Sequence, residues 1–433
     1  MADEVYVTRV FSSPAQVNAQ AWQALLAQEP DASPFVQHAY LNALHEAGCA
    51  RMQAGWQPQF LTLWCGNVLH AACPLYLKNH SYGEYVFDWA WANAYSQHGL
   101  DYYPKAVVAV PFTPVPGARL LALDEQARIA LAQALIEHTR AEGLSSLHLL
   151  FIQPQDVAAC EQAGLMLRHT VQFHWTNVAP ERGAGAPALP PEGAGPALER
   201  PCADAVAPLL GANAPALPDA SGRFANFEHF LASLVQEKRK KIRQERRKVV
   251  EAGVRFRHVE GSDISAADWD FFYRCYERTY MEHGNAPYLN RAFFQRMATD
   301  MPQNWLMFIA EREGQPIASS LIALDGARRI AYGRYWGALE RVDCLHFEAC
   351  YYQPLAWCIA NGVLRFEGGA QGEQKMARAL LPVRTTSAHW LAHPSFADAV
   401  GRFLEREGEG IGNYLSQLNS RSPLKAPRPD ELG

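Results

Sequence analysis

Short apolar runs broken by glycine-centred turns predict strands and hairpins in both halves of the chain. The first half has apolar runs on either side of a turn at Gly66, followed by an aromatic run, and we expect strands at Phe60–Trp64, Val68–Leu77 and Tyr82–Trp91. The second half has the same order around a turn at Gly314, and we expect strands at Trp305–Ala310, Pro316–Leu324 and Arg329–Gly337. When Gly66 is aligned with Gly314, the two sets of strands fall in register, which indicates an internal repeat.

A long helical pattern follows each set of strands. These helices are expected at Asp124–Glu142 and Cys344–Asn361, and each ends at a glycine, the residue that a helix C-terminus favours. Apolar strands at Ser146–Ile152 and Val363–Gly368 come next. Hairpin, strand, helix and strand in this order predict an α/β (α+β) fold built from two copies of one unit, rather than a doubly wound sheet. Because any two α/β domains share such elements, a chance similarity of the halves is the alternative.

Composition changes sharply between the two halves. Residues 179–222 contain 13 Ala, 9 Pro and 6 Gly in 44 positions and no aromatic residue. Such a segment has too little large apolar surface to offset the entropy that is lost on ordering. We therefore expect an N-terminal domain at 1–178, a flexible Ala/Pro/Gly-rich linker at 179–223, and a C-terminal domain at 224–433.

Charge and cysteine content argue against a polycationic protein, a disulfide-linked protein and a zinc site. The 39 Lys and Arg against 44 Asp and Glu give a net charge of −5, so the whole chain is no polycation and any basic site must be local. The nine cysteines form an odd set without a Cys-x-x-Cys pair, which argues against a disulfide framework and a zinc site. The N-terminus lacks the pattern of a signal peptide, and no apolar run is long enough to cross a membrane. We expect a cytoplasmic protein without a membrane span or a bound metal.

Several aromatic-rich motifs resemble a known family. In the first half these motifs are Pro74–Ala92, Tyr102–Lys105 and Pro111–Val115. In the second half they are Lys238–Arg246, Tyr332–Gly337, His346–Gln353 and Gly369–Lys375. Together they resemble the FemAB-like family of N-acyltransferases, also described as peptidoglycan biosynthesis or recognition proteins, over nearly the whole chain except the linker. The resemblance implies two tandem GNAT-like acyl-CoA N-acyltransferase domains and transfer of an acyl or aminoacyl group to an amine, without a particular substrate.

The chemistry of such a transfer points to the central strand of the second half and to the helix after it. The reaction needs a base for the amine proton and donors for the developing oxyanion. Two glycines in Tyr332–Gly337 let the backbone approach a ligand closely, although a packed edge strand is the alternative. A 100° spacing in the helix places His346 with Cys350 on one face and Glu348 with Tyr351 on another. The candidate catalytic residues are Glu348 or His346 as base, Tyr351 or Tyr352 as acid, Arg334 and Gln371.

Two further segments supply candidate substrate-binding residues. The glycine-rich stretch Glu367–Lys375 is expected to form a loop that passes close to a ligand, with a tight surface turn as the alternative. Its spacing is not that of a phosphate-binding loop. The strand expected at Tyr82–Trp91 is semi-polar on both faces and fits one wall of a cleft or a domain interface. The residues from these segments and the central strand are Lys78, Tyr82, Glu84, Asp88, Trp89, Tyr335, Trp336, Gly369, Gly372, Glu373 and Lys375, with Glu367 also pointing into the cleft.

The donor of the acyl group is left open between acyl-CoA and aminoacyl-tRNA. The joint Leu339–Leu345 contains no glycine, which puts the usual coenzyme A pyrophosphate site in doubt. Residues 238–248 form a predicted helix with eight cations in eleven positions, a density that indicates an anionic partner. Lys238, Arg239 and Arg243 are its candidate contacts, and a solvated helix paired with acidic residues is the alternative.

Three hypotheses about function follow from the sequence. The first is an acyltransferase that acts on the amine of a small molecule or a peptidoglycan precursor. The second is a non-catalytic binding module for a peptidoglycan or nucleotide-linked precursor on the same scaffold. The third is an RNA-binding protein that uses the basic helix, with tRNA as its partner.

Overall fold

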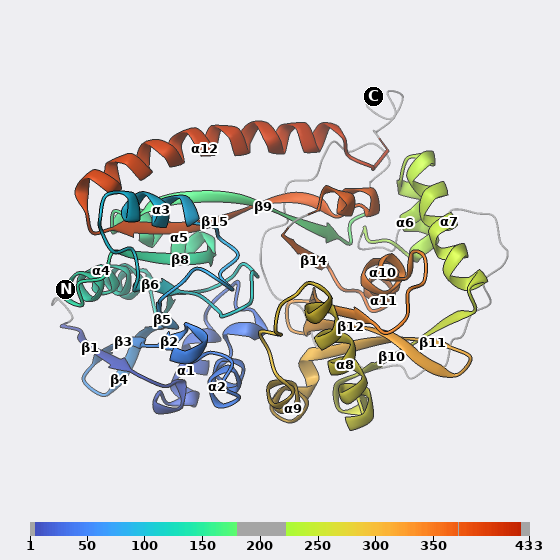
Figure 1. Cartoon of the computed structure of the whole chain (residues 1–433), viewed down its shortest axis with the longest axis horizontal. Coiled ribbons are helices and arrows are strands. Elements are labelled where there is room, and N and C mark those ends of the chain that lie inside the picture. Colours follow the sequence, from blue (N-terminus) through green and yellow to red (C-terminus); the bar gives the residue numbers. More distant parts are fainter. Residues whose placement is uncertain (1–4, 180–221, 371, 426–433) are drawn as a thin grey trace.

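The computed structural model describes residues 5–179, 222–370 and 372–425 of the chain (Figure 1). Both halves contain strands and helices. The first half runs through β1 (Val7–Phe11), α1 (Ala19–Leu26), α2 (His38–Glu46), β2 (Gln57–Pro58), β3 (Phe60–Cys65), β4 (Val68–Cys73), β5 (Leu75–Lys78), α3 (Trp89–Gln97), β6 (Lys105–Val108), β7 (Leu121–Ala122), α4 (Glu125–Ala141), β8 (Ser146–Ile152), α5 (Pro154–Gln162) and β9 (Met166–Thr176).

The second half begins with two helices and then repeats the order of the first. It runs through α6 (Phe227–Ser233), α7 (Gln236–Glu251), β10 (Val254–Glu260), α8 (Ala266–Glu282), α9 (Arg291–Asp300), β11 (Trp305–Arg312), β12 (Gln315–Asp325), β13 (Ile330–Ala338), α10 (Leu345–Phe347), a π-helical turn (Glu348–Tyr352), α11 (Gln353–Ala360), β14 (Arg365–Ala370), β15 (Leu381–Leu391) and α12 (Pro394–Ser420). The basic helix expected at 238–248 is confirmed as the middle of α7.

Strand pairing confirms the internal repeat. β1, α1, α2 and β3 of the first half correspond to β10, α8, α9 and β11 of the second, and both halves continue with an antiparallel hairpin. The central strand then pairs in parallel with the strand after the next helix: β6 pairs with β8, and β13 with β14. This is the strand order expected of a GNAT-like unit, and the chain contains it twice.

The third strand expected in the first half is wrong. Residues Tyr82–Trp91 form no strand, because Tyr85 has a φ of 62° and α3 begins at Trp89. The central strand is β6 instead. The strand expected at Val68–Leu77 is interrupted at Pro74, which has no N–H to donate, and its two pieces belong to different sheets.

The halves are joined by an exchange of their last strands. β9 of the first half pairs with β14 of the second, and β15 of the second pairs with β8 of the first. β9 and β15 also pair with each other, so an eleven-stranded sheet runs through both halves in the order β10-β11-β12-β13-β14-β9-β15-β8-β6-β5-β2. β1, β3, β4 and β7 form a second sheet. Because each half completes the sheet of the other, the division into domains 1–178 and 224–433 stays a prediction from the sequence.

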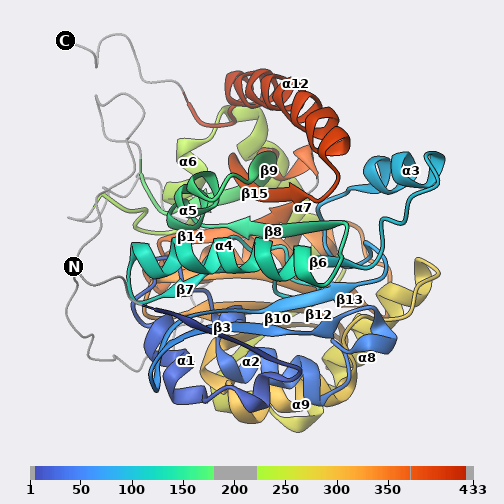
Figure 2. The same ribbon diagram turned by 90° about the vertical axis from the view of Figure 1, so that its left-hand side faces the viewer.

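Helices lie on both sides of this long sheet. α1, α2, α8 and α9 lie along the same side of the molecule in both views, and α12 lies across β9 and β15 (Figures 1 and 2). One cluster of buried apolar side chains contains residues of both halves, such as Trp22 and Phe272. Within it, Phe35 packs edge-on against Tyr332 of β13, with ring centroids 5.3 Å apart. The two halves therefore share a core.

The segment expected to be a flexible linker falls, for residues 180–221, outside the described residues. Its two ends meet, because the backbone N–H of Ala179 donates to the carbonyl of Gly222 at 2.9 Å. The chain therefore leaves the fold and returns to it at one point, as expected of an insertion between two halves.

Candidate active site

A fork between two parallel strands of the second half forms the candidate site. β13 and β14 pair only where Ile330–Tyr332 face Arg365–Glu367, and no ladder between them continues beyond this point in the described residues. A cavity of about 150 Å³ lies where the strands separate. Its walls come from β12, β13, β14 and the helix after β13: Ser320, Ile322, Gly333, Arg334, Tyr335, Trp336, His346, Cys350, Tyr351, Phe366, Gly368 and Lys375. Six of the candidate residues from the sequence are among them.

A β-bulge at Arg334 shapes one wall of this fork. Ile322 of β12 pairs with Gly333, but the neighbouring Leu321 pairs with Tyr335, so Arg334 has no partner in the ladder. An extra residue of this kind redirects the side chains on either side of it and frees backbone groups from the ladder. Free backbone N–H groups at the fork can stabilise the oxyanion of an acyl-transfer intermediate.

The two glycines of this strand admit protein neighbours. A Cβ added at Gly333 would lie 3.0 Å from the ring of Phe366, and one added at Gly337 would lie 2.0 Å from the backbone oxygen of Cys275 in α8. The sequence predicts that a ligand lies close to the backbone at these glycines. At Gly337 the close neighbour is the backbone of α8 instead. Gly337 sets how closely α8 packs on β13.

The π-helical turn corrects the expected faces of the helix after β13. A turn with i to i+5 hydrogen bonds adds a residue and shifts the faces that a 100° spacing predicts. As a result His346 and Tyr351, which the spacing put on different faces, lie together, with ring centroids 5.8 Å apart and an interplanar angle of 88°. Cys350 joins them in the cavity wall. π-helical turns carry no clear sequence signal, so the periodicity could not show this arrangement.

Two nitrogen bases line the cavity with lowered pKa values. Burial lowers the pKa of the Lys375 ammonium to about 8, and its Nζ donates to the carbonyl of Gly368 at 2.6 Å. Loss of hydration, with the cations Arg378 and Lys375 nearby, lowers the pKa of the His346 ring to about 4. His346 is therefore neutral at pH 7, and it remains exposed on one side. A ring of such low basicity is a poor acceptor for the proton of an amine.

Glu348, the first candidate for the base, does not line the cavity. Its carboxylate is buried and accepts from Nε of Arg246 at 3.1 and 3.2 Å and from Nε2 of Gln353 at 2.7 Å. These contacts link the π-helical turn to α7. Both oxygens are thus occupied by protein donors, an arrangement that positions the wall of the cavity.

The stretch Glu367–Lys375 is only partly the loop that the sequence predicts. β14 continues to Ala370, and Glu373–Arg378 form a 3-10 helix. Gln371 lies outside the described residues. Gly369 and Gly372 do not line the cavity, and the exposed Glu373 accepts from the hydroxyl of Tyr414 at 2.9 Å.

Glu367 lies at the base of the fork, paired in register with Tyr332. It stands between Phe366 and Gly368, which line the cavity, and is not itself among the lining residues. Its side chain is buried, one oxygen lies 3.0 Å from Nε of Arg365, and Oε2 has no hydrogen-bond partner among the described residues. Nε2 of His174 lies 3.9 Å from Oε2. Burial raises the pKa of Glu367 to about 7, partly offset by Arg365. A carboxyl with a free oxygen and a pKa near neutrality is well suited to general base catalysis.

The candidate residues of the first half form a separate buried ion cluster. Lys105 of β6 donates to Glu84 at 2.8 Å and to Asp88, and all three side chains are buried. Tyr102 donates to Asp88 at 2.6 Å and contacts His148. The exposed Tyr82 and Trp89, whose rings lie 5.1 Å apart, are the parts of this region that face solvent. None of these residues lines the cavity at the fork.

Lys105 was missed by the sequence analysis, although it lies in the motif Tyr102–Lys105. A lysine at the start of an apolar strand resembles an exposed strand end. Its partners Glu84 and Asp88 are distant in sequence, so no local spacing could reveal the pairing.

Lys78 gives this cluster a pH dependence that can be tested. Its side chain is buried, donates to the carbonyl of Tyr82 at 3.0 Å and lies over the ring of Trp56. Burial lowers its pKa from 10.5 to about 7, partly offset by Glu84. Between these two pH values the unfolded chain holds a proton that the folded chain has released, so stability rises with pH across this window.

Replacing Lys78 by methionine should therefore stabilise the protein at pH 7, by roughly 1–2 kcal/mol in the free energy of unfolding. The gain should shrink as the pH rises towards 10, which urea unfolding at pH 7 and 9.5 would measure. Lys241→Met, at an exposed position of α7, is the control and should show no such trend. A gain that is equal at both pH values would contradict the assignment.

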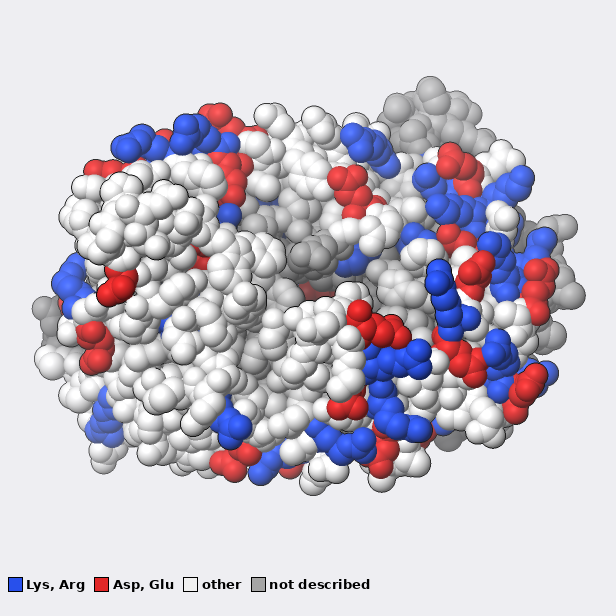
Figure 3. Space-filling view, in the orientation of Figure 1, with Lys and Arg blue, Asp and Glu red and all other residues white. Residues whose placement is uncertain are grey.

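The basic helix α7 packs against the π-helical turn and the 3-10 helix Glu373–Arg378, which both contribute residues to the cavity wall. Its buried Glu245 accepts from Arg378 at 2.9 Å and from the hydroxyl of Tyr352, while Arg246 pairs with Glu348. Of the expected contacts, Arg243 pairs with Glu228 and Lys238 with its neighbour Glu237. The remaining cations of α7 without an ion-pair partner among the described residues are Arg239, Lys240, Lys241 and Arg247. Charged side chains gather over this part of the molecule, and the face is hollowed near its middle (Figure 3).

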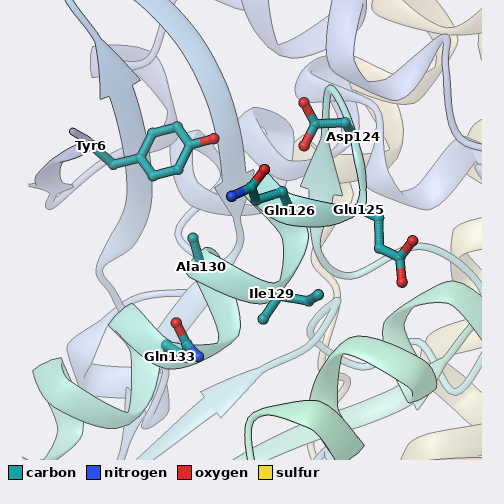
Figure 4. Close-up of a pocket in the computed structure, with 7 residues that line it drawn as sticks. All are labelled: Tyr6, Asp124, Glu125, Gln126, Ile129, Ala130 and Gln133. Atoms are coloured by element: carbon teal, nitrogen blue, oxygen red, sulfur yellow. The ribbon is translucent and has the colours of Figure 1, made fainter. Parts of the chain in front are cut away.

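A second hollow lies beside the start of α4 (Figure 4) and is lined by Tyr6, Asp124, Glu125, Gln126, Ile129, Ala130 and Gln133. It contains none of the residues expected from the sequence. Asp124 caps α4, because its carboxylate accepts from the N–H of Ala127 at 2.8 Å. The fork therefore remains the candidate site.

A family model described as peptidoglycan biosynthesis/recognition matches residues 13–182 and 220–426, on both sides of the inserted segment. The chain belongs to the FemAB-like family. Membership confirms the resemblance seen in the motifs and, with it, an enzyme of the acyl- or aminoacyltransferase class that acts on an amine. No curated protein matches the chain.

Solved structures resemble the FemAB-like chain only distantly. The C-terminal domain of a putative lysylphosphatidylglycerol synthetase from Agrobacterium fabrum has 11% identity and a TM-score of 0.48, covering 91% of this chain and 97% of its own. FemX has 9% identity and a TM-score of 0.48, covering 89% and 99%. A tandem GNAT protein from the clavulanic acid pathway has 11% identity and a TM-score of 0.42, covering 90% and 99%. Among the described residues, no helix combines the length and the apolar character of a membrane span.

Proposed function

We propose that this FemAB-like chain transfers an aminoacyl group from tRNA to the amine of a peptidoglycan precursor, at the fork between β13 and β14. The observation that supports the proposal is the fork itself, where the bulge at Arg334 and the cavity adjoin Glu367, a buried carboxyl with a pKa near neutrality that stands between the cavity-lining Phe366 and Gly368. We place the reaction in the cytoplasm, where aminoacyl-tRNA occurs and where free thiols such as the eight described here persist.

In this proposal each group at the fork has a defined role. Glu367 takes the proton of the attacking amine, whose nitrogen forms the new amide bond with the acyl carbon. The ester bond to the tRNA ribose breaks, and the departing oxygen receives a proton through Tyr351. Backbone N–H groups at the bulge stabilise the oxyanion between these steps. Glu348 positions the wall of the cavity, and Gln371 stays a predicted catalytic residue.

The choice of donor rests on two observations. The backbone N–H groups of Leu345 and Phe347, at the start of α10, donate to the carbonyls of Val342 and Cys344. They are not free to bind a pyrophosphate as coenzyme A would require. In contrast, α7 presents cations without an ion-pair partner beside the fork, and an RNA backbone is a ligand of matching charge.

A donor panel tests the proposal. Purified protein is incubated with charged tRNA or with acetyl-CoA, each with a nucleotide-linked peptidoglycan precursor, and the amide product is measured by mass spectrometry. Product is expected with charged tRNA alone. Product from acetyl-CoA would contradict the assignment of aminoacyl-tRNA as the donor. Binding of the precursor without any product would favour the non-catalytic binding module.

Variants of α7 test the RNA contact separately. Lys240→Gln combined with Arg247→Gln should raise the KM for charged tRNA by about tenfold and lower its dependence on salt, since each lost phosphate contact reduces the salt slope. The matched control is Arg402→Gln with Arg406→Gln, which removes two exposed cations from α12. Equal effects of the two pairs would argue against a specific contact at α7.

A further inference from the structure

Arg334 is a cation without an anionic partner at the fork. It has no carboxylate within ion-pair distance in the described part of the chain. Its Nη2 donates to the carbonyl of Phe112 at 3.1 Å and lies 3.4 Å from the hydroxyl of Tyr335, while its Nε is buried without a partner. By comparison, the buried cations Lys105 and Arg378 each contact a carboxylate, whereas the buried Arg119 donates to the carbonyls of Ala118 and Val115. The Arg334 side chain is partly buried, so a bound anion would offset the hydration that its guanidinium has lost.

Aromatic rings and hydroxyls from both halves surround this guanidinium. It lies 5.1 Å from the ring centroid of Phe35 and 5.0 Å from that of Tyr335. Burial raises the pKa of Tyr40, Tyr85 and Tyr280, and the charge of Arg334 acts in the opposite sense on all three. Ring contacts place Tyr280 in the same group, because Tyr276 lies 5.4 Å from Tyr335 and 4.9 Å from Tyr280 between ring centroids, and Tyr85 packs against the same apolar cluster. One positive charge therefore lies close to phenol groups from α2, α8 and the segment before α3.

The backbone of the first half adopts an unusual conformation at this point. Tyr85 has a φ of 62° and Phe112 a φ of 59°, values that residues other than glycine rarely adopt. Phe112 supplies the carbonyl that Arg334 contacts, and its ring stacks on that of Tyr288 at 4.7 Å. Strained backbone of this kind persists where the surroundings hold it, and it clusters at ligand sites.

The chemistry of this group of side chains selects one class of ligand. A guanidinium offers several N–H donors in a planar fork that matches the oxygens of a carboxylate or a phosphate. Phenol hydroxyls can donate to the same oxygens. We propose that Arg334, with the hydroxyls of Tyr85 and Tyr280, binds an oxyanion of the acceptor, either a carboxylate or a phosphate. The assignment of this anion to the acceptor rests on the proposed function.

The location explains what such a site achieves. Arg334 is the bulged residue of β13, next to Tyr335 in the wall of the cavity, and it is among the cations that lower the pKa of Glu367. An acceptor held by its oxyanion at Arg334 would present its amine near the base and the acyl carbon. Holding two reactants in this way replaces a bimolecular encounter by an oriented one.

Calorimetric titration of the full chain tests the site without requiring turnover. The phosphate probe is uridine diphosphate. The carboxylate probe is N-acetyl-alanyl-alanine, and its C-terminal amide serves as the control without a charge. The wild type is expected to bind one of the two anionic probes, and the amide at least about tenfold more weakly than the free acid if the carboxylate is the ligand.

Variants identify the residues responsible. Arg334→Gln should weaken binding of that probe by about tenfold or more, and Arg334→Lys by less, because an ammonium keeps the charge but loses the planar fork. Tyr85→Phe and Tyr280→Phe, which remove only a hydroxyl, should each weaken it by about threefold. Arg274→Gln, at an exposed position of α8, is the matched control and should leave binding unchanged. If Arg334→Gln fails to fold, the binding affinities of Tyr85→Phe and Tyr280→Phe test the site instead.

The proposal is overturned if the wild type binds neither anionic probe, or if the dissociation constants of the Arg334 and tyrosine variants stay within about twofold of the wild type. The outcome is separate from that of the donor panel. If binding depends on Arg334 but the donor panel shows no turnover, the proposed transfer reaction is contradicted and the oxyanion site is supported. If the donor panel shows turnover but binding does not depend on Arg334, the transfer reaction is supported and the oxyanion site is contradicted.

Discussion

Replacing Glu367 by glutamine should lower kcat by about 10²–10⁴-fold, the usual contribution of a general base. The amide keeps the shape of the side chain and its contact with Arg365, but it accepts no proton from the attacking amine. Because burial raises the pKa of Glu367 to about 7, its basic form appears as the pH rises through neutrality. The wild-type rate should therefore rise with pH around 7, and the variant should lose this limb of the pH profile.

Two controls accompany this variant. Glu340→Gln changes an exposed carboxyl that pairs with Arg312, and it should leave the rate within about twofold of the wild type. Glu348→Gln separates the two candidate bases: as a positioning residue it should lower the rate without removing the limb near pH 7. A Glu367→Gln enzyme that keeps both the wild-type rate and its pH profile would exclude Glu367 as the base.

Replacing Gly337 by alanine should destabilise the fold by about 3 kcal/mol, near the upper end for overpacking a close-packed interior. The added Cβ would lie 2.0 Å from the backbone oxygen of Cys275 and 2.3 Å from its carbon. Both are main-chain atoms in the middle of α8, so they can move away only if the helix shifts. Urea unfolding followed by circular dichroism would measure the loss.

Gly326→Ala is the matched control, because nothing lies within 4 Å of a Cβ built there. Its stability should stay within about 0.5 kcal/mol of the wild type. The comparison matters for the site as well, since α8 carries Tyr280. If Gly337→Ala unfolds at the same urea concentration as Gly326→Ala, the close packing of α8 on β13 does not hold in solution.

Much of the fold could be predicted from local patterns. The hairpins around Gly66 and Gly314, the helix α4 and the basic helix α7 depend on nearby residues, and the structure has them close to where they were expected. The third strand of the first half failed for a physical reason. The alternation through Glu84 and Asp88 looked like two semi-polar faces of a strand, but these carboxylates fold inward onto Lys105.

The candidate site could be predicted only in part. The motif around Tyr335 and the helix with His346 were recognised, and both line the cavity. The π-helical turn that brings His346 to Tyr351, and the burial that raises the pKa of Glu367, arise from long-range packing. Neither leaves a spacing in the sequence that can be read without the fold.

The exchange of β9 and β15 sets a limit on how this protein could be divided. A gene cut at the inserted segment would yield one product that carries β9 without β14 to receive it, and another in which β15 lacks β8. Each fragment would expose unpaired strand edges, which can pair with strands of other chains and cause aggregation. If the two fragments were made together, β9 could still pair with β14 and β15 with β8. Each half therefore needs the other half in order to complete its sheet.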